Sequence, residues 1–341
     1  MDEVTTIGLD LAKHVFQAHG ADASGAVVFR KRLRRDQVLQ FFAGQRRCLV
    51  AMEACAGAHH WAREIGALGH ETRLIPPAYV KPFVKRQKND AADAEAICEA
   101  AQRPTMRFVI PKSAEAQAST TVFRTRDLLV RQRTQMINAL RGHLTEYGMT
   151  VRKGAENAPK LIALIRDPAS ELPQEARSAL EVLAQMLELV EEKIAALDAE
   201  IAARAKTNPL IKRLMTIPGI GAITATALAA LAPTPETFRR GRDFAAWIGL
   251  TPLQKSSGGK ERLGKVSKMG ERTLRRLLII GASSATKAAA RRGAPPQTWL
   301  GRMLLRKPRM LVTVALANKI ARIAWALMAH GGTYRAPATA S

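Results

Sequence analysis

Four carboxylates in the first hundred residues have the types and spacing of a metal site. Asp10 ends the β-branched run "EVTTIGLD", and Glu53 ends the apolar run "RCLVAME". Asp90 and Asp93 lie three residues apart in "NDAADAEAICEAAQ", so one face of a helix would carry both. Oxygen ligands suit Mg²⁺ or Mn²⁺, and two such ions about 4 Å apart can clamp the attacking and leaving oxygens of a phosphoryl transfer. The predicted catalytic and metal-binding acids are therefore Asp10, Glu53, Asp90 and Asp93.

Each acid also has an ordinary structural interpretation. Asp10 could be a turn residue, Glu53 could pair with a surface arginine, and the two later aspartates could favour a helix N-terminus through its dipole. Four converging carboxylates would repel one another unless cations lay between them, so we favour the metal site. Two neighbouring lysines could either contact phosphate or balance this charge: Lys13 and Lys88.

A serine pair in the basic segment "GLTPLQKSSGGKERLGKVSKMG" is the second candidate for chemistry. Taken alone, Ser256 and Ser257 followed by two glycines are typical of a flexible turn. A serine hydroxyl is a poor nucleophile unless a base, a metal or positive charge lowers the barrier, and clustered cations suit a pentavalent phosphate transition state. Composition leaves both interpretations open. The side chains expected to contact nucleic acid here are Lys255, Lys260, Arg262, Lys265 and Lys268.

The elements that must position the acids are predicted in residues 1–110. Three consecutive strands, "EVTTIGLDLAK", "HVFQAHGA" and "AVVFRKRL", precede a helix, a strand, a helix, a strand and a helix. This order is the layout of a ribonuclease H-like (RuvC-like) α/β domain. Sites in open α/β sheets form beyond the strand ends, where Asp10 and Glu53 would lie.

Residues 111–205 are expected to form a helical coiled-coil region. Apolar residues repeat every three and four positions through "QEARSALEVLAQMLELVEEKIAALDAEIAARAK", and "FRTRDLLVRQRTQMINALRGHLTEYG" could supply a partner helix. An antiparallel hairpin within one chain would bury this seam; we slightly favour packing between subunits for part of it. The seam consists of Leu180, Leu183, Leu187, Val190, Ile194, Leu197 and Ile201.

Residues 206–330 are expected to form a mostly helical C-terminal domain, followed by a disordered tail at 331–341. In "LMTIPGIGAITATALAAL", a turn around Gly219 and Gly221 separates two helical runs and resembles a helix-hairpin-helix. The glycines of such a turn let backbone N–H groups approach a DNA phosphate. The alternative is a tight turn used only for packing.

The composition points to a polyanionic partner. The chain of 341 residues has 53 lysines and arginines against 29 acids, a net charge of +24, and neutralising phosphates releases counterions and so favours binding. No secretory signal or membrane anchor is recognised, and the apolar stretch 310–329 is predicted to be a buried helix. Three cysteines without a CxxC pair favour neither disulfides nor zinc. We expect a cytoplasmic, nucleoid-associated protein that binds nucleic acid.

The combined motifs resemble a known family. "GLDLAK", "AMEACAG", "KNDAADA", "IPGIG", "WIGLTPLQKSSGGKERLGKVSKMG" and "LRRLLIIGA" are similar to the DEDD transposases of the bacterial insertion-sequence one-ten family, and most similar to its one-one-one-one subgroup. The Piv-like invertases are relatives. The resemblance covers roughly residues 4 to 330.

This resemblance implies a specific mechanism. Asp10, Glu53, Asp90 and Asp93 would be the DEDD ligands of Mg²⁺ or Mn²⁺ in a RuvC-like domain. The serine before Gly-Gly, Ser257 with Ser256 in reserve, would form a covalent phosphoserine link to DNA. The resemblance also implies a dimer or tetramer in which the acids of one subunit can face the serine of another. A bridge RNA would pair with donor and target DNA.

Three functional hypotheses follow. The first is an RNA-guided DNA transposase or recombinase. The second is a RuvC-like, metal-dependent, structure-specific nuclease in which the acids direct water and the serine is incidental. The third is a nucleic-acid-binding protein without catalysis. A covalent protein–DNA adduct distinguishes the first from the second, and neutralising the acids distinguishes both from the third.

Overall fold

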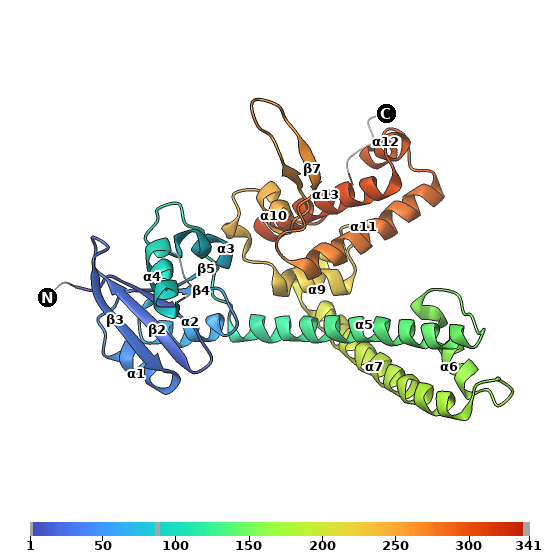
Figure 1. Cartoon of the computed structure of the whole chain (residues 1–341). Helices are drawn as coiled ribbons and strands as arrows, with labels where there is room; N and C mark the ends of the chain where they lie inside the picture. Colours follow the sequence, from blue (N-terminus) through green and yellow to red (C-terminus); the bar gives the residue numbers. More distant parts are fainter. Residues whose placement is uncertain (1–2, 86–88, 337–341) are drawn as a thin grey trace. The chain divides into compact units, whose positions relative to one another are not determined.

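The computed structural model describes residues 3–85 and 89–336, and the chain divides into two compact units between Gln117 and Ala118 (Figure 1). The first unit contains a five-stranded sheet with helices, and the second is mostly helical with a two-stranded hairpin. The predicted mixed α/β and helical composition is therefore confirmed. The finer division at residues 110, 205 and 330 stays a prediction.

The sheet has the order β3-β2-β1-β4-β5. Strands β1, β2 and β3 are antiparallel neighbours, whereas β4 and β5 run parallel to β1. The predicted order of three strands, helix, strand, helix, strand and helix is present, with a short extra helix, α3, before the last one. The elements are β1 (Thr6–Asp10), β2 (Val15–Ala21), β3 (Val27–Arg34), α1 (Val38–Ala43), β4 (Leu49–Glu53), α2 (Ala58–Ala67), β5 (Glu71–Ile75), α3 (Pro77–Val80) and α4 (Asp90–Ala101).

Alternation along β1 separates the two faces of the sheet. Ile7 and Leu9 are fully buried in a core shared with side chains of α1 and α2. Gly8 points to the opposite face, where a Cβ atom would lie only 2.2 Å from the carbonyl oxygen of Ala94 in α4. The backbone of α4 therefore rests directly on β1, and only glycine permits this approach. This contact fixes α4 beside the strand that ends at Asp10.

Two long helices and a short one open the second unit. An ion pair joins Arg126 of α5 to Asp198 of α7, with one N–O distance of 3.0 Å, and Arg204 donates to Ser119 at 3.2 Å. At the other end, Leu140 and Leu187 share a core cluster. The helices thus pair antiparallel within one chain, which is the hairpin alternative. Their bounds are α5 (Ala114–Glu146), α6 (Ala158–Arg166) and α7 (Gln174–Thr207).

The predicted seam is largely buried: Leu180 and Leu187 lie in a core that α5, α6 and α7 share, and Ile201 lies in the C-terminal core. Leu183 and Leu197 are half-buried, and the other five seam residues are buried. Supercoiling of the helices and packing between subunits stay predictions. The five buried positions are Leu180, Leu187, Val190, Ile194 and Ile201.

Five of the remaining helices share one apolar core that includes Leu228, Phe244, Leu274 and Ile320, and the two short strands form a hairpin outside it. By length and composition alone, Arg309–His330 could cross a membrane, but five of its seven buried residues belong to this core, as expected of a buried helix. The elements are α8 (Pro209–Met215), α9 (Ala222–Leu231), α10 (Gly241–Trp247), β6 (Pro252–Gln254), β7 (Leu263–Val266), α11 (Arg272–Arg292), α12 (Trp299–Arg306) and α13 (Arg309–His330).

Part of the predicted disordered tail has defined contacts. The Tyr334 backbone amide donates to Thr216 Oγ1 at 2.9 Å, and the Tyr334 side chain packs against the C-terminal core. Residues 337–341 lie outside the described residues, so for them disorder stays a prediction.

Candidate active site

Three of the four predicted acids meet in the N-terminal unit. One carboxylate oxygen from each of Asp10, Asp90 and Asp93 lies within 4.8 Å of the other two. Asp10 and Asp93 are half-buried, and Asp90 is exposed. Three oxygen donors at this separation fit the ligand preference of a hard divalent cation such as Mg²⁺ or Mn²⁺.

Glu53, the fourth predicted acid, interacts electrostatically with two of the clustered aspartates, Asp10 and Asp93. It ends β4, the parallel neighbour of β1, and is half-buried. Its carboxylate lies outside the group of three, but burial and, secondarily, the charge of Asp93 raise the pKa of Glu53. Asp93 therefore couples electrostatically to Glu53 as well as to Asp10.

The electrostatics of Asp10 show the effect of this crowding. Burial raises the pKa of Asp10 from an ordinary 3.8 to about 6, and the charges of Asp93, Asp90 and Glu53 add to the rise. A hydrogen bond from the Leu11 backbone opposes it. A cation among the acids would offset their mutual repulsion, so the donor set fits the predicted metal.

The first turn of α4 delivers its two aspartates to this place. Asn89 precedes the helix in an extended conformation, and its side chain accepts a hydrogen bond from the Ala91 amide at 3.0 Å. This is the usual N-cap arrangement, and it fixes where the helix starts. Asp90 and Asp93 then fall in the first turn, near the end of β1. Of the two neighbouring lysines, Lys13 is exposed and Lys88 lies outside the described residues.

The serine pair lies at the tip of the β6–β7 hairpin in the second unit. Ser257 and Lys260 form an antiparallel bridge, and the Lys260 amide donates to the Ser257 carbonyl at 3.1 Å. Between them, Gly258 and Gly259 have φ angles of 56° and 75°. Two successive positive φ angles are the pattern of a type I′ hairpin turn, which strongly prefers glycine. The expected turn at SSGG is confirmed.

The two serines have different surroundings. Ser256 Oγ accepts a hydrogen bond from the Arg262 amide across the hairpin at 3.1 Å. The Ser257 hydroxyl is exposed and makes no hydrogen bond to any residue that the structure describes. Ser256 thus helps to close the hairpin, whereas Ser257 presents a free hydroxyl beside the turn. The five predicted nucleic-acid contacts, all exposed, are Lys255, Lys260, Arg262, Lys265 and Lys268.

The base of this hairpin is fixed by residues that the sequence did not single out as functional. One guanidinium nitrogen of Arg275 donates to the carbonyls of Ile248, at 2.8 Å, and Met269, at 2.7 Å, on either side of the hairpin. Gly249 and Gly270 have φ angles of 79° and 74°, and a Cβ on either would lie within 2.0 Å of a backbone oxygen. The spacing of these glycines around the hairpin is the one signal that could have identified the base.

The predicted helix-hairpin-helix turn joins α8 to α9. Gly219 has a φ of 90°, and a Cβ there would lie 2.7 Å from the carbonyl oxygen of Gly281 in α11. Gly221, in contrast, has no atom within 4 Å of a Cβ position. Gly219 therefore has a packing role, and contact with DNA at either glycine stays a prediction.

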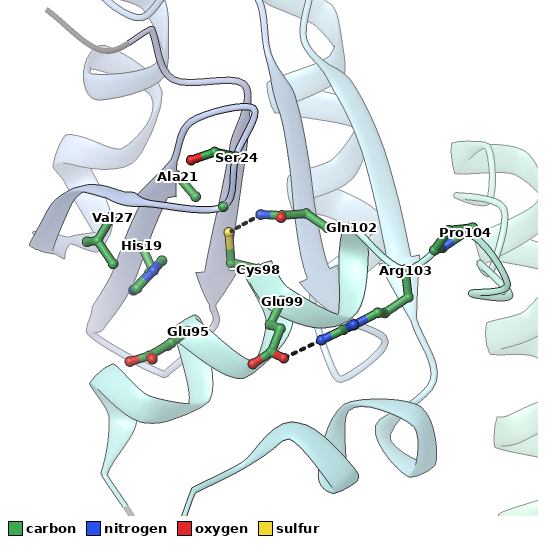
Figure 2. A pocket seen from close by; sticks show the side chains of 11 residues that line it. His19, Ala21, Ser24, Val27, Glu95, Cys98, Glu99, Gln102, Arg103 and Pro104 are labelled. Carbon is green, nitrogen blue, oxygen red and sulfur yellow. Dashed lines mark hydrogen bonds and ion pairs between the residues drawn. The ribbon is translucent and has the colours of Figure 1, made fainter.

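A separate cavity of about 400 Å³ lies between the β2–β3 connection and α4 (Figure 2). His19 lines it, is 4% exposed, and its Nδ1 has no hydrogen-bond partner among the described residues. Burial lowers the pKa of His19, so the ring is neutral near pH 7. On the α4 side, Gln102 donates to Cys98 at 3.7 Å and Arg103 pairs with Glu99. No local sequence pattern predicts this cavity, because it forms between elements distant along the chain.

Comparison with known proteins covers both candidate regions. A family model for DEDD transposases of the IS110 type matches residues 7–149, which include all four acids, and the model "Transposase IS116/IS110/IS902 family" matches residues 211–295, which include both serines. A "Probable family 20 transposase" of Pseudomonas aeruginosa is 48% identical over 97% of this chain and 99% of its own length. The transposases for insertion sequence elements IS1328 of Yersinia enterocolitica and IS1111A of Coxiella burnetii are each 40% identical over 98% of this chain, covering 99% and 92% of their own lengths.

Proposed function

The chain belongs to the IS116/IS110/IS902 family of transposases, and from this premise we propose that it cuts and rejoins donor and target DNA through a covalent phosphoserine intermediate. The observation that carries the proposal is the meeting of Asp10, Asp90 and Asp93 within 4.8 Å in a chain of net charge +24. An acidic cluster in so basic a protein suits phosphodiester chemistry assisted by a divalent cation.

We assign the N-terminal unit to the RuvC-like fold, with Asp10, Glu53, Asp90 and Asp93 as the residues that would hold Mg²⁺ or Mn²⁺. When bound, such ions supply charge stabilisation to the oxygens of a reacting phosphate. The protein's own contribution is to hold the carboxylates in place. The capped first turn of α4 and its contact with Gly8 support this role.

Ser257 is the proposed nucleophile, with Ser256 in reserve. The Ser257 Oγ attacks the phosphorus, its proton passes to water, and the bond from phosphorus to the leaving deoxyribose oxygen breaks as that oxygen takes up a proton. A deoxyribose hydroxyl from another strand then attacks the phosphoserine and releases the serine. The free hydroxyl of Ser257, beside a turn without side chains and among exposed lysines, supports this assignment.

The partners of this reaction are donor and target DNA and a bridge RNA. The excess of 24 positive charges would neutralise several phosphate backbones at once. No side-chain motif for reading bases was recognised in the sequence, which is compatible with base pairing to an RNA choosing the site. We further propose that the protein works as a dimer or tetramer in the bacterial nucleoid.

A denaturing-gel assay tests the covalent step. The full-length protein, Ser257→Ala and the matched Ser256→Ala are incubated with element-end DNA, the RNA that co-purifies with the protein, and Mg²⁺, and then denatured. We expect a protein–DNA adduct with the native protein, none with Ser257→Ala, and a reduced amount with Ser256→Ala because the hairpin loses one bond. An adduct that persists without Ser257, or DNA cleavage by the native protein with no adduct, contradicts the proposed nucleophile.

A further inference from the structure

The sheet register places side chains from three strands in one row. Asp10 on β1 pairs with Gln17 on β2, and Gln17 pairs with Arg32 on β3. Laterally paired residues point to the same face of a sheet, and neighbouring strands are about 4.8 Å apart. The backbone positions of Asp10 and Arg32 are therefore about 10 Å apart. The row starts at the acidic cluster and ends at the edge of the sheet.

This row lies on the face that carries α4. Arg30, two residues before Arg32 on β3, pairs with Glu95 of α4 at 3.3 Å. The intervening side chains point the other way: Leu33 is 2% exposed in the core formed with α1 and α2, and Lys31 lies over the ring of Phe41. Arg30, Arg32 and the next alternate residue, Arg34, therefore share the face of the acids.

Helix α4 leaves the outer end of the row uncovered. The helix runs from the acids toward the start of β1, since Ala94 lies over Gly8 and Cys98 contacts the Thr6 carbonyl at 3.8 Å. Gln17 and Arg32 lie level with Asp10, at the end where α4 begins. The side chain of Arg32 is exposed there.

Arg32 and its neighbour on the same face, Arg34, are available for a ligand. Arg32 forms no ion pair with any described residue, and Arg34 has only a 3.7 Å contact with Asp36 while its side chain is 71% exposed. The Gln17 side chain is half-buried and has no hydrogen bond within the described parts of the chain. By contrast, Arg35 stacks on the rings of Phe16 and Trp61.

We propose that Gln17, Arg32 and Arg34 form a track that binds the phosphodiester backbone of the strand whose reacting phosphate lies at Asp10; this rests on the proposed metal-dependent site. The acids repel a phosphate, so the strand needs cationic contacts immediately beside them. Arginine suits this role, because its planar guanidinium bonds two phosphate oxygens at once.

A pair of matched double variants of the full-length protein tests the track. Arg32→Gln with Arg34→Gln removes two charges from the proposed track. Arg46→Gln with Arg47→Gln removes two exposed charges near the start of β4, at the opposite end of the sheet. Fluorescence anisotropy measures the affinity of each protein for a labelled DNA duplex and for an RNA hairpin with the same number of phosphates, at about 50 to 200 mM NaCl.

We expect the row variant to weaken duplex binding about tenfold per arginine at roughly 0.1 M salt and to flatten the salt dependence by about 0.9 per arginine. The rate of adduct formation should recover at saturating DNA, since the row binds the strand and takes no part in the chemistry. The control double variant should change the duplex affinity and its salt dependence much less.

Two results overturn the track. The first is an equal loss of duplex affinity in the two double variants. The second is a loss of affinity for the RNA hairpin alone, which would assign these arginines to RNA rather than to the reacting strand. Failure of the proposed function has a different signature. If Asp10→Asn leaves adduct formation intact, the proposed metal site is refuted. The affinities of the two arginine double variants test the track independently of that result.

Discussion

The raised pKa of Asp10 predicts that this carboxylate destabilises the protein when no cation is bound. The folded-state pKa of about 6 lies above the ordinary value of 3.8. Between these values the folded protein holds a proton that the unfolded chain has released, so stability falls as the pH rises through this window and is lowest above pH 6. Below about pH 4 both states are protonated, and the penalty disappears.

The size of the penalty follows from the shift. Two pKa units correspond to about 3 kcal/mol, and solvent screening of a half-buried group reduces this to about 1–2 kcal/mol. Asp10→Asn should therefore stabilise the cation-free N-terminal unit by about 1–2 kcal/mol at pH 7.5 and by nothing measurable at pH 4. The same substitution should abolish stabilisation by Mg²⁺ or Mn²⁺, which binding to the native acids supplies.

Hydrogen exchange of the β1 backbone amides, measured in chelator and corrected for the intrinsic pH dependence of exchange, reports this local stability without assuming two-state unfolding of the whole chain. Asp36→Asn, an exposed carboxylate in the same unit, is the control for loss of one negative charge. If Asp10→Asn destabilises β1 at pH 7.5, or if both variants respond equally, the argument from crowded carboxylates is refuted.

Two further predictions concern the second unit. Gly219→Ala should lower the thermal midpoint of unfolding by several degrees, because the new Cβ would meet Gly281 and the φ angle is 90°. Gly221→Ala should leave stability unchanged and weaken only DNA binding. Equal thermal midpoints for the two variants would contradict the packing role of Gly219. Arg275→Ala should release the base of the serine hairpin and slow adduct formation at least tenfold at saturating DNA, with Arg275→Lys partly restoring the rate. Arg272 is an exposed charge on the same turn of α11, and Arg272→Ala should lower only the affinity for DNA. An equal loss in the rate of adduct formation with Arg272→Ala would contradict the role of Arg275 in positioning the serine hairpin.

Local patterns in the sequence predicted several elements correctly. The three strands and the helices of the N-terminal unit follow from residue alternation and turn residues, and the turn at SSGG follows from the freedom of two glycines to adopt positive φ. The family was also recognisable from motifs spread over the chain, and the matches at both ends of the protein confirm it.

Other features depend on contacts between distant residues. Nothing local distinguishes Ser256 from Ser257; the bond from Arg262 across the hairpin does. The seam of α7 would fit a partner from its own chain or another equally well by periodicity, and the Arg126–Asp198 pair places α5 against it within the chain. The packing of Gly219 against Gly281 of α11 likewise depends on tertiary structure, and its contact with DNA stays a prediction.

Residue types and their spacing already indicate the chemistry open to this protein: acids at the ends of strands and a helix, a serine before a glycine turn, and an excess of positive charge. These follow from residue type and short-range geometry. The tertiary structure decided which of those groups meet. Asp10, Asp90 and Asp93 converge because the Gly8 contact seats α4 on β1, and Gln17 and Arg32 share their row because of strand register. Such proximity arises from packing between segments more than eighty residues apart, which no local pattern encodes.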